Sequence, residues 1–148
     1  MNKIKEIIIG TNNEGKYREI CDLLPNDIKK HSPKKFDILS PAETGTSFEE
    51  NSFIKASYFS KKTNLICLSD DSGLEIDLLN GEPGIYSSRW SGEKNNFNLA
   101  IKKIFEKMNN VKKDWKNNFF HSAKKVSYNK QILLGYYLSN PFLYFPFF

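Results

Sequence analysis

The spacing of apolar residues along the chain predicts several strands. Residues 4–9 contain an isoleucine run, which is typical of a strand buried on both faces. Residues 36–39 are a candidate short strand, and residues 65–69 predict a second buried one. Residues 74–79 alternate apolar and acidic side chains, which predicts a half-exposed strand.

Helices are predicted between these strands. A helix is expected from Lys16 to just before Pro25, and a capping-box signal at residues 46–50 predicts another to about Lys62. Asn95 is a candidate cap for a third helix. The apolar positions expected in the core recur at helical spacing: Ile20, Leu23, Leu24, Phe48, Ile54, Tyr58, Phe59, Phe97, Ala100, Ile101, Ile104, Phe105 and Met108. Because strands and helices interleave, the chain is predicted to have an α/β fold.

Charge is unevenly distributed along the 148 residues. The chain has 22 basic and 17 acidic residues, a net charge of +5. Residues 1–111 hold 16 of each kind, so all of the excess lies in residues 112–148. The larger part of the chain is therefore neutral by count, which argues against nucleic acid as its partner.

Length, cysteine content and hydropathy indicate the number of domains and the cellular location. The length suits a single domain with its own core. Cys21 and Cys67 form no disulfide framework or metal-binding motif, so we expect buried free thiols. No apolar run is long enough for a signal peptide or a membrane helix. A cytoplasmic protein without a membrane partner is expected.

The turn at residues 10–16 is the first candidate site. It follows a predicted buried strand and opens a helix, whose unpaired N–H groups attract phosphate. Its Gly10-to-Lys16 spacing approaches a P-loop, but Tyr17 stands where a P-loop needs a small hydroxyl for Mg²⁺. The alternative is an ordinary strand–turn–helix with a surface lysine.

Acidic residues form two further candidates. Asp70 and Asp71 follow the predicted strand at residues 65–69, where carboxylates can hold Mg²⁺; a solvated turn is the alternative. Glu43 lies in a loop before the second helix and could help to bind a cation. Asn51 and Lys55 are four residues apart on one face of that helix, so the lysine could reach phosphate.

The loop at residues 81–92 is a fourth candidate, because it is long and rich in turn residues. Its Arg89 could contact an anion or a partner chain. His31 and His121 have no metal-binding or catalytic companions nearby in the sequence, so each is expected to be structural or on the surface.

Together these segments resemble the noncanonical purine NTP pyrophosphatase (inosine triphosphate pyrophosphatase) family. The resemblance lies in TNNEGK at residues 11–16, ETGTSFEEN at 43–51, IKA at 54–56, SDDSGL at 69–74 and PGIYSSRWSG at 83–92. It implies an elongated mixed β-sheet flanked by helices, with a cleft between two lobes, and a homodimer. It also implies Mg²⁺-dependent hydrolysis of ITP, dITP and XTP to the monophosphate and pyrophosphate.

The resemblance also implies roles for individual residues. Asp71 would be the metal-linked general base, and Lys55 would face the phosphate chain as a second catalytic residue. Glu43, Asp71 and the adjacent Asp70 would be the metal-binding residues. The residues expected to bind substrate are Thr11, Asn12, Asn13, Glu14, Gly15, Lys16 and Ser72.

The family pattern stops after Ala123. We therefore expect a partial pyrophosphatase-like domain at residues 1–123 and a divergent, aromatic-rich tail at residues 124–148 without a clear strand or helix pattern. Family members continue with a segment that holds the base, so truncation or a frameshift is expected, and activity is expected to be weak or lost. The alternatives are a nucleotide-binding remnant without catalysis, a Maf-like nucleotide pyrophosphatase, and nucleic-acid binding through the basic end.

Overall fold

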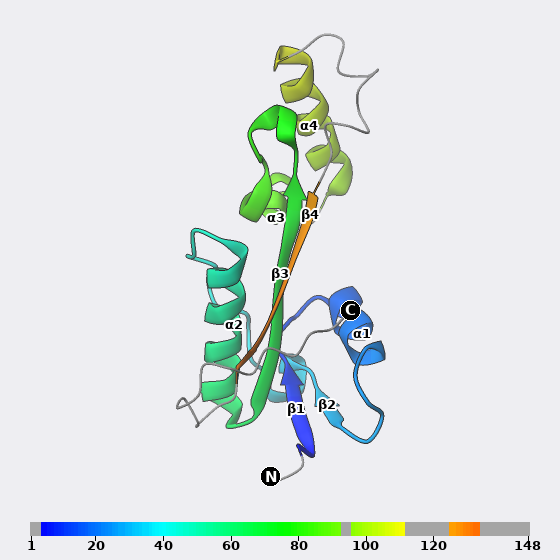
Figure 1. Ribbon diagram of the computed structural model, residues 1–148, viewed down its shortest axis with the longest axis vertical. Coiled ribbons are helices and arrows are strands. Elements are labelled where there is room, and N and C mark those ends of the chain that lie inside the picture. Colours follow the sequence, from blue (N-terminus) through cyan, green and yellow to red (C-terminus); the bar gives the residue numbers. More distant parts are fainter. Residues whose placement is uncertain (1–3, 93–95, 112–124, 134–148) are drawn as a thin grey trace. The chain divides into compact units, whose positions relative to one another are not determined.

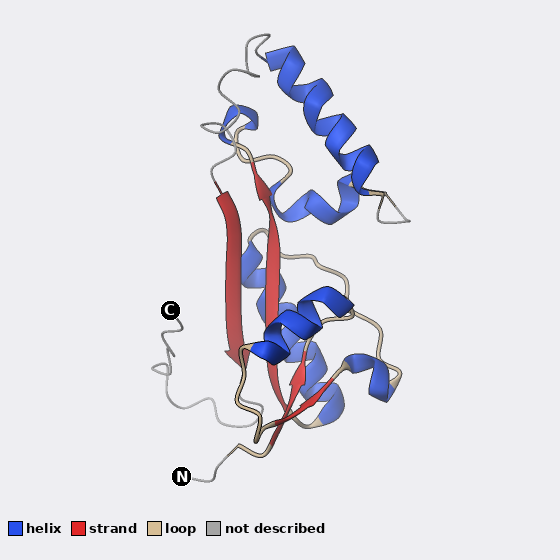
Figure 2. Cartoon of the chain, turned by 90° about the vertical axis from the view of Figure 1, so that its right-hand side faces the viewer, coloured by secondary structure: helices blue, strands red, loops and turns tan. Residues whose placement is uncertain are grey.

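The chain forms an α/β fold, as the sequence pattern predicts. The computed structural model describes residues 4–92, 96–111 and 125–133. Within them one sheet has the strand order β2-β1-β3-β4, and β1 pairs in parallel with both β2 and β3. Figure 2 shows β4 beside β3 and running the opposite way, so the sheet is mixed. The strands are β1 (Glu6–Ile9), β2 (Lys29–His31), β3 (Ile66–Glu75) and β4 (Lys125–Leu133).

The helices are α1 (Glu14–Asp22), α2 (Phe48–Thr63), α3 (Ser87–Trp90) and α4 (Phe97–Val111), with short 3-10 helices at Pro33–Phe36, Asp77–Leu79 and Gly84–Tyr86. The predicted helices are present as α1, α2 and α4, whereas α3 lies in a segment that the sequence predicts to be a loop. The side-chain oxygen of Asn96 accepts a hydrogen bond from the N–H of Leu99, which is an N-cap contact for α4. The predicted cap, Asn95, lies outside the described residues. No helix in the described part of the chain is long and apolar enough to cross a membrane.

The described residues fall into two compact units. The first comprises residues 4–45, 49–70 and 130–133, and the second comprises residues 46–48, 71–92, 96–111 and 125–129. The division along β3 falls between Asp70 and Asp71. We describe each unit separately.

The isoleucines of β1 organise the core of the first unit on both faces of the sheet. Ile7 and Ile9 pack with Ile20 of α1 on one face, whereas Ile8 packs with Ala56 and Phe59 of α2 on the other. Figure 1 shows α1 and α2 on opposite sides of β1. This confirms a first strand that is buried on both faces, since alternate side chains of a strand point to opposite faces.

The core of the second unit is smaller. Ile76, Leu79 and Met108 are buried together, so α4 packs against the 3-10 turn that follows β3. The predicted apolar stripe of α4 is only partly buried, because Phe97 is 73% exposed and Phe105 is 40% exposed. In α1, Leu23 was also expected in the core but is exposed.

Two predicted strands are wrong. Residues 36–39 were expected to be extended, but Phe36 ends a 3-10 helix whose first residue is Pro33, and Asp37 adopts a left-handed conformation. The polar segment Lys29–His31 forms the strand instead, because its backbone pairs with β1. Residues 74–79 do not form a separate strand, since β3 continues to Glu75 and the chain then turns.

β4 was not predicted at all. It lies in the segment at residues 124–148, where the sequence shows neither clear alternation nor a helical stripe. Its place beside β3 therefore depends on pairing with a distant part of the chain.

Candidate functional site

The turn after β1 is fixed tightly against β3. The Gly10 N–H donates to the Leu68 carbonyl at 2.7 Å, and the Ser69 hydroxyl donates to the Gly10 carbonyl at 2.9 Å. A Cβ at Gly10 would lie 2.8 Å from Sγ of Cys67, so only glycine fits at this position. Burial raises the pKa of the Cys67 thiol to about 12, which keeps it neutral. The start of the candidate phosphate-binding turn is therefore anchored to the neighbouring strand.

Asn13 begins α1. Its Oδ1 accepts hydrogen bonds from the N–H groups of Gly15 and Lys16, at 2.9 and 3.1 Å, and its own N–H donates to Oγ1 of Thr11. This is an N-cap, and it engages amides that a bound phosphate would otherwise meet. The helix therefore begins at Glu14, two residues earlier than the apolar pattern predicts.

Asn12 turns away from that cap. Its Nδ2 donates to the Ile38 carbonyl and to Oγ of Ser40, which ties the turn to the segment after the 3-10 helix. Its Oδ1 is buried and makes no hydrogen bond in the described part of the chain. Asn12 therefore has one acceptor atom still available for a donor.

Lys16 faces a buried carboxylate. Its Nζ lies 3.2 Å from Oδ2 of Asp70, whose side chain is completely buried. Neither Asp70 oxygen makes a geometrically aligned hydrogen bond in the described residues, so the contact is an ion pair. A buried carboxylate is strongly unfavourable without a cation beside it, and Lys16 supplies that charge. The turn at residues 10–16 and Asp70, which the sequence offered as separate candidates, thus meet at one place.

Residues 69–73, whose composition is typical of a turn, do not form a turn. Residues 69–73 lie inside β3, whose strand continues to Glu75. Successive side chains of a strand point to opposite faces, so Asp70 and Asp71 are directed to different sides. Asp71 is also buried. A strand is possible at this polar sequence because Lys16 neutralises Asp70 and the backbone is paired within the sheet.

Gly73 lets β3 pass close to residues 81–92, which the sequence predicts as a loop but which contain α3 and the 3-10 helix at Gly84–Tyr86. A Cβ at Gly73 would collide with the carbonyl oxygen of Gly84 and lie 2.7 Å from Oγ of Ser87. That hydroxyl accepts from the Leu74 N–H and donates to the Gly84 carbonyl. In the same segment the guanidinium of Arg89 stacks 4.8 Å from the ring centre of Tyr86. The hydrogen bonds of Ser87 and the absence of a side chain at Gly73 together fix the close approach of this segment to β3.

A second lysine–carboxylate pair lies at the start of α2. Nζ of Lys55, a buried residue, is 3.0 Å from Oε1 of Glu43 in the preceding loop. Asn51 is completely buried on the same helix, and its Oδ1 accepts a 2.8 Å hydrogen bond from the Gly45 N–H. The structure therefore brings together Glu43 and Lys55, which the sequence placed in one motif.

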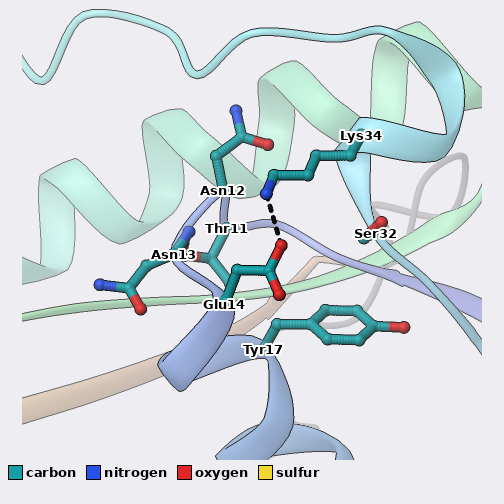
Figure 3. Close-up of a pocket in the computed structure, with 7 residues that line it drawn as sticks. All are labelled: Thr11, Asn12, Asn13, Glu14, Tyr17, Ser32 and Lys34. Atoms are coloured by element: carbon teal, nitrogen blue, oxygen red, sulfur yellow. Dashed lines mark hydrogen bonds and ion pairs between the residues drawn. The ribbon is translucent and has the colours of Figure 1, made fainter.

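A small pocket of about 120 Å³ lies beside the α1 N-terminus. Figure 3 shows Glu14 and Lys34 reaching toward each other across it, and they form an ion pair. This pairing lowers the pKa of the Glu14 carboxyl. The lining residues are Thr11, Asn12, Asn13, Glu14, Tyr17, Ser32 and Lys34. Sequence reasoning missed Ser32 and Lys34, because no motif links them to a turn some 20 residues earlier.

His31 has a structural role, as expected. It is buried, and its Nε2 lies 2.9 Å from Oε2 of Glu6 on the neighbouring strand. This hydrogen bond lowers the pKa of the Glu6 carboxyl. His121 lies outside the described residues.

The carboxylate side chains at this site are of the kind that binds a divalent cation. Carboxylate oxygens are the ligands that Mg²⁺ prefers, and both Asp70 oxygens are buried without a hydrogen bond in the described chain. Within residues 4–92, 96–111 and 125–133, however, no three His, Cys, Asp or Glu side chains form a ready metal-binding cluster.

The chain is similar in sequence to a family of known proteins. The Ham1 family model matches residues 7–134. A dITP/XTP pyrophosphatase of Vibrio vulnificus strain YJ016 is 42% identical over 121 residues, which cover 80% of this chain and 60% of that protein. A dITP/XTP pyrophosphatase of Bacillus licheniformis is 40% identical over 132 residues, which cover 83% of this chain and 64% of that protein.

Solved structures show the same fold. The structure of a HAM1 protein from Coxiella burnetii matches with a TM-score of 0.67 and 37% identity, over 73% of this chain and 55% of that one. The Staphylococcus aureus Ham1 protein matches with a TM-score of 0.63 and 39% identity, over 72% of this chain and 55% of that one. The chain therefore belongs to the Ham1 family. It spans about 60% of the length of the first of these curated relatives.

Proposed function

We propose that the protein is a Mg²⁺-dependent hydrolase of noncanonical purine nucleoside triphosphates. ITP, dITP and XTP would be cleaved to the monophosphate and pyrophosphate. The observation that carries the proposal is the Lys16–Asp70 ion pair at the start of α1, where a phosphate-binding turn meets an acidic strand. The printed activity of the Vibrio and Bacillus relatives, dITP/XTP pyrophosphatase, supports the same substrate class.

Residues 11–16 and Ser72 would hold the substrate. Lys16 is partly exposed, so its ammonium can contact a phosphate while it stays close to Asp70. A positive charge and a helix N-terminus both favour a polyanion at this turn. Lys55 would face the phosphate chain and stabilise the charge that develops on the leaving pyrophosphate.

Glu43 and Asp71 would hold Mg²⁺, and Asp70, which is directed to the other face of β3, would contribute to the site through Lys16. When bound, the ion would spread the triphosphate charge and lower the pKa of a coordinated water. Asp71 would accept the proton of the water that attacks the α-phosphorus. Asp70 would keep Lys16 oriented, because its carboxylate already lies 3.2 Å from the ammonium.

The family resemblance supports two further proposals about the protein's setting. We propose that it acts in the cytoplasm and assembles as a homodimer. Light scattering on the purified protein would give a mass near twice 17.2 kDa if the second proposal holds. A monomer mass at all concentrations would contradict it.

Product analysis tests the activity. The purified chain is incubated with dITP or XTP and MgCl₂, and nucleotides and pyrophosphate are separated by ion-exchange chromatography. We expect weak turnover that yields equal amounts of monophosphate and pyrophosphate, loss of activity with EDTA, and a fall of about 10²–10⁴-fold in kcat for Asp71→Asn. Saturable binding of dITP without product would instead identify a nucleotide-binding protein without catalysis.

A further inference from the structure

A buried asparagine of α2 holds the backbone of the loop that carries Glu43. Asn51 is completely buried, and its Oδ1 accepts a 2.8 Å hydrogen bond from the backbone N–H of Gly45. A Cβ at Gly45 would lie 2.6 Å from Cβ of Glu50 and 2.8 Å from Oδ1 of Asn51. The loop backbone therefore lies against the helix at a distance that only glycine permits.

A second contact lies one turn further along the helix. Asn51 and Lys55 are four residues apart, so they share one side of α2. Nζ of Lys55 meets Oε1 of Glu43 at 3.0 Å, and Glu43 precedes Gly45 by two residues. The backbone contact at Gly45 thus limits where the Glu43 carboxylate can lie relative to Lys55.

The two polar atoms of the Asn51 side chain have different surroundings. Its Nδ2 is buried and has no hydrogen-bond partner in the described part of the chain. An unpaired buried donor is unfavourable, but a leucine of similar size would also remove the acceptor of the Gly45 N–H. The useful atom is the Oδ1 that holds Gly45.

We propose that Asn51 is a positioning residue that holds the loop at residues 43–45 so that the Glu43 carboxylate meets Lys55. The inference rests on the proposed function only in assuming that Glu43 and Lys55 take part in hydrolysis. Asn51 acts through the loop backbone, by fixing the geometry in which the two charged groups face each other.

Chemical labelling tests the positioning without any need for turnover. The folded protein is acetylated with limiting acetic anhydride, and the labelling rate of Lys55 is read by peptide mass spectrometry against the exposed Lys61 and Lys62. Loosening of the loop exposes the Lys55 ammonium, so Asn51→Leu is expected to raise its rate at least about tenfold. Asn51→Asp keeps an oxygen acceptor for the Gly45 N–H and is expected to restore protection to within about threefold. The matched control is Asn110→Leu, an exposed position on α4, and it should leave the rate unchanged.

Kinetics with dITP give the functional readout. Misplaced reacting groups lower the chemical rate, so Asn51→Leu should reduce kcat by about 10- to 100-fold. The KM for dITP should change by less than about threefold, because the turn at residues 11–16 is untouched. A fall in kcat that only follows a lower melting temperature, with Lys55 still protected, would overturn the proposal.

Gly45→Ala provides a second test that leaves Asn51 in place. The added Cβ pushes the loop away from α2, so the same rise in Lys55 labelling is expected. If Gly45→Ala and every folded variant of Asn51 label at the wild-type rate, the proposal is wrong. If the wild-type protein fails to hydrolyse dITP, the proposed function fails, and the labelling result still decides the role of Asn51.

Discussion

Two lysine–carboxylate pairs in the first unit bury opposite members. In the Lys16–Asp70 pair the acid is buried, with a side chain 0% exposed, and the lysine retains 27%. In the Lys55–Glu43 pair the lysine is buried, with 8% exposed, and the acid retains 29%. An ion that has lost its hydration depends on its partner more than a hydrated ion does. The exposed member of each pair is therefore the more accessible of the two from solvent.

This difference is consistent with the complementary roles proposed for the two pairs. The first presents a partly exposed ammonium, which suits a phosphate group. The second presents a partly exposed carboxylate, which suits a divalent cation. A magnesium complex of a nucleoside triphosphate carries both kinds of charge, so the contrast supports the proposed substrate class.

The largest effect on stability is expected for Lys16→Met. The substitution leaves the buried Asp70 carboxylate without its cation, so the free energy of unfolding should fall by about 2–4 kcal/mol. Asp70→Asn should cost less, about 1–2 kcal/mol, because the remaining Lys16 can be hydrated. Urea unfolding at pH 7 measures both. If Asp70→Asn lowered the free energy of unfolding more than Lys16→Met does, Asp70 would not be the member that depends more on its partner.

In the Lys55–Glu43 pair, replacing the acid should lower the free energy of unfolding more than replacing the lysine, and both losses should be smaller than for Lys16→Met. Glu43→Gln removes the charge beside the buried Lys55 and is expected to cost about 1–2 kcal/mol. Lys55→Met keeps the apolar stem and removes a charge beside Glu43, which is partly exposed and can be hydrated, so it should cost less than about 1 kcal/mol. The same urea experiment applies, and equal losses for the two variants would contradict the assignment of the buried member.

The smallest effect is expected for the exposed Lys34–Glu14 pair, where the measured quantity is the pKa of Glu14. Lys34 lowers the pKa of the Glu14 carboxyl, so Lys34→Met should raise that pKa toward 4.5, although Arg18 still lowers it slightly. A carboxyl whose pKa is depressed in the folded state adds stability above its unfolded pKa and loses it as the pH falls through the folded pKa. Carbon-detected NMR titration of Glu14 measures the shift. An unchanged Glu14 pKa would show that the ion pair does not persist in solution.

Local features of the fold could be predicted from the sequence. The isoleucines of β1 and the spacing in α2 each depend on neighbouring residues, and the structure confirms both elements. The motifs also placed Glu43 and Lys55 in one segment, and these residues do meet. Such features are readable because periodicity and capping act within a few residues.

Features that depend on distant pairing could not be predicted. The strand β2 is polar and exists because its backbone pairs with β1. Residues 69–73 have the composition of a turn, yet the sheet and the charge of Lys16 hold them in β3. The positions of Lys34 in the pocket and of Asp70 beside Lys16 likewise follow from the tertiary fold.

Hydrolysis of dITP in ¹⁸O-labelled water tests the central claim most directly. If water attacks the α-phosphorus, mass spectrometry will find one ¹⁸O atom in the deoxyinosine monophosphate and none in the pyrophosphate. Label in pyrophosphate or in orthophosphate would contradict that mechanism. A complete absence of labelled product, with dITP intact and Mg²⁺ present, would contradict the proposal that this chain is a pyrophosphatase.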